Sequence, residues 1–333
     1  MNILHAIFTK EFAGSERYAC QLAAMQAAAG HKVLLLIKPP RGDEGLAYVH
    51  RMVREAGAAQ VAHIPAWWPS VLDSWAVRGV ANGFAPEMIH THLGRATKRC
   101  AKAAKALKVP HVATLHLAYG KDYAACDGLV CIAEWQRAGI PASYKGKVAT
   151  VWNWVHPVKR KAVGKAGVVT FGSVGRLVDK KGMDVLVAAF REAFPKGTEK
   201  VALEIVGQGP QRAELEKLAM GDGRISLLGF VENVEALYPR WHTYVSAARY
   251  EPFGLTILEA MAAGCRLVCS TTQGPQEFLA DYKVGWAEAG HVGSMAKALR
   301  AAAKQPPVRV PWDMSPFAPK RALAAIEGFY KSF

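Results

Sequence analysis

The sequence predicts an α/β fold of two Rossmann-like, doubly wound domains that face a central cleft. Short apolar runs alternate with helical patterns in the first half, an irregular stretch follows, and the alternation then resumes. Strands that alternate with helices of this length are typical of parallel sheets. The length of 333 residues also suits about two domains. Such sheets bind ligands at the carboxyl ends of their strands, so we expect the site in the cleft.

The first half begins the alternation at the N-terminus. Its expected strands are the apolar runs at residues 3–7, 33–37, 61–64, 88–90, 111–115, 129–132 and 148–151. Helical patterns separate them, for example at residues 15–29 and 97–107. We therefore predict a first domain over residues 1–155.

The second half follows a break in the pattern. Residues 152–161 combine Trp, Pro and Lys without either period, which predicts a linker. Further strands are expected at residues 168–174, 201–206, 225–228, 244–246 and 267–269. We predict a second domain over residues 156–312 and a C-terminal helix within residues 313–333.

The composition predicts a cytoplasmic protein without a membrane span. No apolar run reaches the roughly 18 residues that a spanning helix needs. The N-terminus lacks the basic start and cleavage site of a signal peptide. The six cysteines form no Cys-x-x-Cys or paired zinc pattern, so we expect buried thiols in a reducing compartment.

The net charge of +15 is concentrated in the first half. Residues 1–165 hold 22 Lys and Arg against 10 Asp and Glu, a net of +12, which leaves +3 for residues 166–333. This asymmetry predicts an anionic partner for the first domain, namely a membrane surface, an acidic glycolipid or a nucleic acid.

The most informative motif is a pair of glutamates, Glu251 and Glu259, around a turn. Pro252 and Gly254 mark the turn, and the helix formers of residues 255–263 predict that a helix begins there. Unpaired amides at a helix N-terminus favour anions. Carboxylates beside it accept hydrogen bonds from ligand hydroxyls. A ligand that combines phosphate and sugar fits this pattern.

The motif resembles the signature of the retaining GT-B glycosyltransferases of family four, which include glycogen-synthase-like and lipopolysaccharide-building enzymes. Their pattern is a Glu, seven residues and a second Glu around Pro-Phe-Gly, and here it continues through a small-residue tail to Gly264. The resemblance covers most of the chain. It implies sugar transfer from a nucleotide-diphosphate sugar, here expected to be a UDP-hexose, with retention of configuration. It also implies no cofactor, no obligatory metal, and a final helix that crosses back to the first domain.

The resemblance assigns roles in the second domain. Arg176 follows a Gly and Lys181 precedes one, as do the residues that grip the diphosphate in the family. Together they would neutralise the departing diphosphate. Glu251 would hold sugar hydroxyls and Glu259 the ribose, while the backbone near Val231 would recognise the base. The expected donor-binding residues are Gly14, Arg176, Lys181, Val231, Glu251, Phe253, Gly254, Leu255 and Glu259.

The first domain contributes a loop and three histidines. Residues 12–17 resemble the family's Gly-Gly-x-Glu-Arg loop, with Ala13 in place of the first Gly. Gly14 would approach the donor and Ser15 would lie on the acceptor side. A histidine at the end of a strand often lies near the donor sugar in this family, and the matching residue is His116.

Strand ends of such sheets bind ligands, which favours a role for these histidines in the site over a purely structural one. The expected catalytic residues are His116, Glu251, Arg176 and Lys181. His90 and His92 end the preceding strand and are expected to shape the acceptor side.

A basic helix face in the first domain points to a membrane partner. Its residues recur at helical spacing, and they are Arg95, Lys98, Arg99, Lys102 and Lys105. A basic face is often only solvated, but here it occurs with a strongly basic domain and with Trp67 and Trp68. Tryptophan favours membrane interfaces, although burial of these two explains them equally well.

We therefore expect a glycosyltransferase that modifies a membrane-associated glycolipid or lipopolysaccharide core. It would be cytoplasmic and peripheral on the inner face of the membrane. The alternatives are a protein that binds nucleic acid or another anionic polymer through the basic half, and a nucleotide-binding Rossmann enzyme of another class. The first lacks the motifs of nucleic-acid modules, so no nucleic-acid partner is expected, and a dehydrogenase would need the missing Gly-x-Gly-x-x-Gly.

Overall fold

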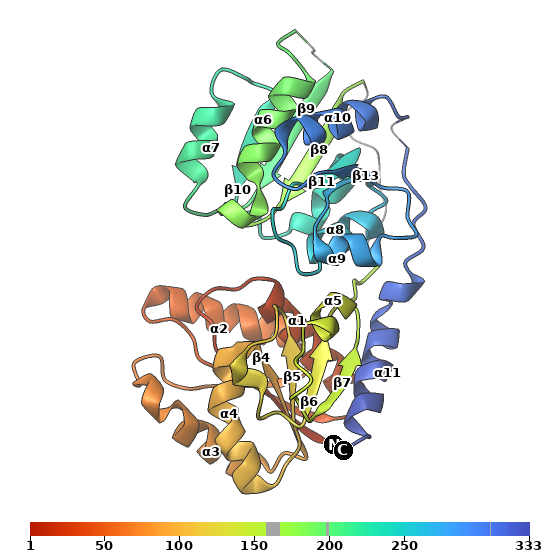
Figure 1. The fold of residues 1–333 in the computed structure, drawn as a ribbon. Coiled ribbons are helices and arrows are strands. Elements are labelled where there is room, and N and C mark those ends of the chain that lie inside the picture. Colours follow the sequence, from red (N-terminus) through yellow and green to blue (C-terminus); the bar gives the residue numbers. More distant parts are fainter. Residues whose placement is uncertain (158–166, 198–199, 307) are drawn as a thin grey trace. The chain divides into compact units, whose positions relative to one another are not determined.

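The computed structural model describes residues 1–157, 167–197, 200–306 and 308–333. They form two compact units, one of residues 1–153 with 320–333 and one of residues 154–319. Each unit holds one parallel sheet with helices on its two faces (Figure 1). The prediction of two doubly wound domains is confirmed.

The first unit contains a seven-stranded sheet in the order β3-β2-β1-β4-β5-β6-β7. The order reverses between β1 and β4, where Ile7 pairs with His92. The strands are β1 (Asn2–Ile7), β2 (Lys32–Ile37), β3 (Gln60–His63), β4 (Met88–His92), β5 (His111–Leu115), β6 (Gly128–Cys131) and β7 (Lys147–Thr150). Nearly every residue of the central strands is buried, which explains their continuous apolar runs.

Helices cover both faces of this sheet. They are α1 (Gly14–Ala28), α2 (Asp43–Ala56), α3 (Asp73–Phe84), α4 (Leu93–Leu107), α5 (Glu134–Ala138) and α11 (Pro319–Tyr330). One core lies between the sheet and helices α3 and α4, with Val77, Ile89 and Cys100 fully buried in it. The last helix, α11, returns to this sheet, because Tyr330 hydrogen-bonds to His90 of β4.

The second unit contains a six-stranded sheet in the order β10-β9-β8-β11-β12-β13. Its order reverses between β8 and β11. The strands are β8 (Val169–Val174), β9 (Val201–Val206), β10 (Ile225–Gly229), β11 (Thr243–Ser246), β12 (Arg266–Ser270) and β13 (Gly285–Ala287). Its helices are α6 (Met183–Ala193), α7 (Arg212–Ala219), α8 (Leu255–Ala262), α9 (Gln273–Phe278) and α10 (Val292–Ala303).

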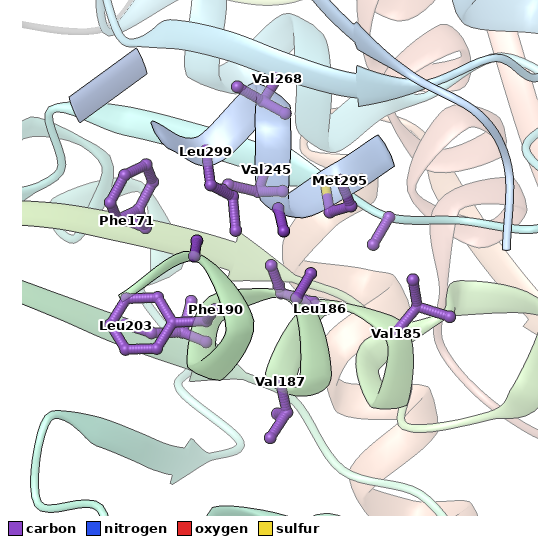
Figure 2. Close-up of a cluster of buried hydrophobic side chains, with 14 of the residues drawn as sticks. Phe171, Val185, Leu186, Val187, Phe190, Leu203, Val245, Val268, Met295 and Leu299 are labelled. Carbon is purple, nitrogen blue, oxygen red and sulfur yellow. The ribbon is translucent and has the colours of Figure 1, made fainter. Parts of the chain in front are cut away.

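The main core of the second unit joins α6 and α10 to the sheet (Figure 2). Leu186 and Phe190 of α6 meet Leu299 of α10 over Phe171 of β8, and all four are buried. Each such side chain contributes roughly 1.5–3 kcal/mol by burial. This packing fixes the position of the turn between β8 and α6.

Two smaller predictions can be compared with the structure. Residues 152–157 of the expected linker lie in no helix or strand, and the rest of it, residues 158–161, lies outside the described residues. The six cysteines are all free and buried, as predicted. No helix in the described ranges is both long and apolar enough to cross a membrane.

Candidate active site

Three of the predicted donor residues, Arg176, Lys181 and Glu251, lie at the switch point of the second sheet. Strand β8 has β9 on one side and β11 on the other. Arg176 and Lys181 follow β8, and Glu251 follows β11. Because all the strands are parallel, these segments emerge at the same carboxyl edge, which is where such sheets bind ligands.

An ion pair connects the two segments. Lys181 Nζ lies 2.5 Å from Glu251 Oε2. The backbone reinforces this pairing, because the amide of Arg249 donates to the carbonyl of Lys180 at 2.9 Å. The Arg249 guanidinium also contacts both carboxylate oxygens of Asp184, at 2.8 and 2.6 Å. The sequence predicted Lys181 and Glu251 separately, and the structure shows that they are partners.

Positive charge gathers around this pair. Burial lowers the pKa of Lys180, and the nearby charges of Arg176 and Lys181 lower it further. Arg176 is exposed at the start of the same loop. Lys180, Lys181 and Arg176 thus bring positive charge close to Glu251, which suits an anionic ligand such as a diphosphate.

Gly182 sets the direction of the chain after Lys181. It has a φ of +62°, a left-handed conformation that favours glycine. A Cβ atom here would lie 2.1 Å from the carbonyl oxygen of Ala247. Only glycine therefore lets the turn after β8 pack against the end of β11.

The turn before α8 has the form that the sequence predicted. Gly254 has a φ of +114° and precedes Leu255, the first residue of the helix. Phe253 is buried and stacks on Phe278 with ring centroids 4.7 Å apart, which fixes the turn. The amides of Ile257 and Leu258 both donate to the carbonyl of Gly254. The amides before them begin the helix, and donors at a helix N-terminus favour anions.

Glu259 lies on α8 and is almost fully buried. The hydroxyl of Tyr238 donates to its Oε2 at 2.5 Å. Sequence reasoning missed Tyr238, which lies in a short turn without a motif. Val231 is half-buried in the turn that follows β10, at the same carboxyl edge.

The loop of residues 12–17 lies at the switch point of the first sheet, after β1. Glu16 accepts a hydrogen bond from the Ala13 amide at 2.8 Å and another from the Ser15 hydroxyl at 3.0 Å. Ala13 has a φ of −138°, an extended conformation that any residue adopts. The substitution of the family's first Gly therefore imposes no strain, and Gly14 is exposed at the start of α1.

The predicted histidines form a buried cluster in the first unit. His90 and His92 lie on β4, and their rings stack with centroids 4.8 Å apart. His92 Nδ1 lies 3.3 Å from Nε2 of His116, which follows β5. His5 on β1 completes the cluster, with its Nδ1 3.1 Å from His92 Nε2.

Burial keeps these histidines neutral. It lowers the pKa of His116 to about 3 and that of His5 to about 4, and it holds the pKa values of His90 and His92 well below 6.5. They therefore act as hydrogen-bonding groups rather than cations. In the described part of the chain, no group of His, Cys, Asp or Glu is arranged to hold a metal ion.

Gln26 and Tyr330 support the cluster from two helices. Gln26 Oε1 lies 2.6 Å from His5 Nε2, and Tyr330 bonds to His90 Nδ1. His90 Nε2 lies 2.7 Å from the Thr114 hydroxyl. The signal that sequence reasoning overlooked is His5, a polar residue within an otherwise apolar strand.

The basic residues predicted on one helix face do share a face of α4. Arg95, Lys98, Lys102 and Lys105 are exposed, and Arg99 is half-buried. The tryptophans differ from one another. Trp67 is 70% exposed, whereas Trp68 is half-buried against the core beside α3.

A pocket of about 480 Å³ in the first unit lies away from the predicted site residues His90, His92 and His116. Lys105, Lys108, His111 and Asp127 line part of it. His111 begins β5, so the pocket is at the amino-terminal edge of the sheet. Ligands of doubly wound sheets bind at the opposite edge, and we do not assign it to the active site.

Comparison with known families decides between the expected classes. The family described as Glycosyltransferase Family 4 matches residues 12–170, and the family described as Glycosyl transferases group 1 matches residues 157–315. The chain is a family 4-like glycosyltransferase of GT-B fold. These matches favour a glycosyltransferase over the two alternatives, a nucleic-acid-binding protein and a Rossmann enzyme of another class.

Curated relatives of this glycosyltransferase include enzymes of lipopolysaccharide core biosynthesis. It is 25% identical over 292 residues to the core glycosyltransferase LpsD of Rhizobium meliloti. This alignment covers 83% of this chain and 80% of the relative. It is also 25% identical over 319 residues to LpsE of the same organism, covering 90% and 88%.

Solved structures share the fold at low identity. A glycosyltransferase from Rickettsia africae has a TM-score of 0.76 and 14% identity, with coverage of 99% and 97%. Anabaena HepE in complex with UDP and glucose has a TM-score of 0.72 and 15% identity, with coverage of 99% and 94%. The lipopolysaccharide outer core galactosyltransferase WaaB has a TM-score of 0.71 and 15% identity, with coverage of 99% and 100%.

Proposed function

We propose that this glycosyltransferase moves a hexose from a UDP-hexose to a lipopolysaccharide-core acceptor with retention of configuration. The observation that carries the proposal is the Lys181–Glu251 pair at the switch point of the second sheet. Two relatives act in lipopolysaccharide core biosynthesis, and HepE of similar fold binds UDP and glucose. These likenesses support both the donor and the acceptor.

The donor residues act mainly on the leaving group. Arg176 and Lys181 neutralise the charge that develops on the departing diphosphate, and the amides after Gly254 donate to its oxygens. Glu251 accepts from the sugar hydroxyls, and its contact with Lys181 orients both groups. Glu259 accepts from the ribose while Tyr238 holds its other side.

Base recognition is proposed at the turn after β10. The backbone near Val231 would contact the uracil there. On the acceptor side, Ser15 follows Gly14 in the first turn of α1. His90 and His92 have no exposed surface, so they would shape this side through His116 rather than by contact.

A transfer assay tests the function. A panel of UDP-hexoses is offered with a core oligosaccharide acceptor, and the product is analysed by mass spectrometry and proton NMR. The expected product gains one hexose in the anomeric configuration of the donor, and EDTA leaves the rate unchanged. An inverted product, or a rate lost in EDTA and restored by manganese, would contradict the mechanism.

We also propose that the first unit binds anionic membrane through the basic face of α4. Each basic residue near such a surface contributes about 1 kcal/mol, screened over roughly 10 Å at 0.1 M salt. Trp67 and Trp75 are exposed in the neighbouring segment, and exposed indoles favour the interface. Such docking would hold the enzyme beside a lipid-linked acceptor.

Charge reversal tests the docking. The triple variant Arg95→Glu, Lys98→Glu and Lys102→Glu should lose binding to vesicles that contain anionic lipid, and salt should weaken the binding of the wild type. The matched control reverses three exposed lysines of the second unit, Lys283, Lys297 and Lys304. Sedimentation of the α4 variant and the wild type to the same extent would show that this face is only solvated.

A further inference from the structure

A line of hydrogen bonds runs through the first unit from Gln26 to His116. His5 Nε2 lies 2.6 Å from Gln26 Oε1. On its other side, His5 Nδ1 lies 3.1 Å from His92 Nε2. His92 Nδ1 then lies 3.3 Å from His116 Nε2. Each of the two inner histidines therefore uses both ring nitrogens.

The amide of Gln26 gives this line a direction. Its Nε2 donates to the Tyr330 hydroxyl at 3.3 Å, so its Oε1 faces His5. An amide oxygen only accepts, and His5 Nε2 must therefore carry the proton. Burial lowers the pKa of His5 to about 4, which keeps the ring neutral near pH 7. A neutral imidazole has a single N–H, so His5 Nδ1 is an acceptor.

The same reasoning applies to His92 and then to His116. His92 must donate from Nε2 to His5, and its Nδ1 then accepts. His116 must donate from Nε2 to His92. Burial lowers the pKa of His116 to about 3, so this ring is also neutral and its Nδ1 holds a lone pair.

The last histidine of the line, His116, is the one that reaches the surface. His5 and His92 have no exposed surface, whereas His116 is 9% exposed just after the carboxyl end of β5. Among the residues that the structure describes, none is a hydrogen-bond partner of His116 Nδ1. The free lone pair is therefore available to a ligand at the edge of the sheet where ligands bind.

We propose that Gln26, His5 and His92 are positioning residues that hold His116 as a hydrogen-bond acceptor for a hydroxyl group of the bound sugar. This ligand rests on the proposed function, but the tautomer does not. A fixed acceptor selects a hydroxyl, which can donate, over an ionised phosphate or a carbonyl, which cannot. Three buried side chains thereby set the chemistry of one nitrogen of His116.

Histidine side-chain NMR tests the tautomer directly. In the ¹⁵N-histidine-labelled full chain, long-range proton–nitrogen correlations distinguish a protonated Nε2 from a protonated Nδ1. The expected result between pH 6 and pH 8 is a single Nε2–H tautomer for His5, His92 and His116, each assigned by its own substitution. An Nδ1–H tautomer or a mixture at His116 in the wild type would overturn the proposal.

Two variants test whether Gln26 determines the tautomer of His116. Gln26→Met keeps the volume but removes the amide, so the His116 signals should move to a mixture of tautomers. Thr97→Val removes another buried hydrogen bond of this unit, between Thr97 and Thr91, and should leave His116 unchanged. If Gln26→Met does not fold, Tyr330→Phe releases the amide orientation instead and should produce the same mixture. An unchanged His116 signal in a folded variant of either kind would contradict the proposal.

Activity separates this proposal from the function on which it rests. In Gln26→Met, sugar transfer should fall by about fivefold to tenfold, the effect of one hydrogen bond, while UDP binding by the second unit stays unchanged. If the wild type transfers no sugar from any UDP-hexose, the proposed function fails while the NMR result still stands. Full transfer by a variant with a mixed tautomer would refute the role in sugar recognition alone.

Discussion

Glu259 shows how a tyrosine outside any motif contacts a candidate site residue. Its carboxylate is nearly buried and accepts from the Tyr238 hydroxyl at 2.5 Å. Tyr238→Phe removes the donor and should cost about 1–3 kcal/mol of stability, because a buried charged acceptor loses a partner. UDP affinity should fall as well, since the proposed ribose ligand is no longer held.

The matched control for Tyr238→Phe is Tyr282→Phe. Its hydroxyl donates to the Asp313 carbonyl at 2.7 Å on the exposed side of the same unit. Thermal unfolding and calorimetry of both variants give the comparison. If the two variants bind UDP equally well, Glu259 does not depend on Tyr238.

At the scale of single residues, the sequence predicts those that lie in a motif and misses the residues that contact them. The resemblance to the motifs of the family identifies Arg176, Lys181, Glu251 and Glu259. Their partners come from distant parts of the chain, as Tyr238 does. Pairing across such separations depends on packing, which no local pattern encodes, so the Lys181–Glu251 contact was also not foreseen.

Among the elements, the turn between β8 and α6 is tightly constrained by its surroundings. Gly182→Ala would place a Cβ atom 2.1 Å from the Ala247 carbonyl oxygen at a φ of +62°. The conformation alone costs about 1 kcal/mol, and the clash should raise the loss to about 2–4 kcal/mol. The displaced turn should also weaken nucleotide binding, because it carries Lys181.

Gly290→Ala is the control for this turn. Its φ is +78°, but the nearest atom to an added Cβ lies 4.0 Å away. Gly290→Ala should therefore lose only the stability that the backbone conformation costs, about 1 kcal/mol. Calorimetric unfolding of both variants measures the difference, and equal losses would show that the close approach to β11 is relaxed easily.

Long elements were predictable because their burial is uniform. The central strands are buried on both faces and read as apolar runs, and α8 begins at Leu255 after the predicted turn. Short elements were not predictable from the sequence. Strand β13 has three residues and α9 has six, too few for a period to show.

For the whole molecule, the buried histidines predict a stability that depends on pH. The groups concerned are His5, His90, His92, His111 and His116, and burial lowers the pKa of each. The unfolded chain binds protons below about pH 6.5 and the folded chain does not, so stability is full above that pH and falls below it. Each histidine contributes about 1.4 kcal/mol per pH unit until its folded pKa is reached.

Calorimetry at pH 7.5 and pH 5 measures this dependence. The first unit should lose several kcal/mol of stability on acidification, and the second unit, where burial lowers the pKa of His242, should lose less. Hydrogen exchange by mass spectrometry assigns the loss to one unit. Equal stability of the first unit at the two pH values would mean that its histidines are not held neutral.

The account as a whole depends on the proposed anion site in the second unit, which Arg176, Lys181 and the turn at Gly254 would form. Charge-assisted hydrogen bonds of this kind are worth about 1.5–3 kcal/mol, or roughly tenfold or more in affinity. Glu251→Gln should leave UDP binding intact or tighter, because Lys181 loses a competing carboxylate. Its turnover should still fall.

Isothermal titration with UDP tests this claim most directly. The wild type should bind UDP, and Arg176→Ala and Lys181→Ala should each bind at least about tenfold more weakly. Arg300→Ala, which removes an exposed cation from α10 of the same unit, should bind as the wild type does. UDP affinities of Arg176→Ala and Lys181→Ala equal to that of the wild type would contradict the assignment of the donor site.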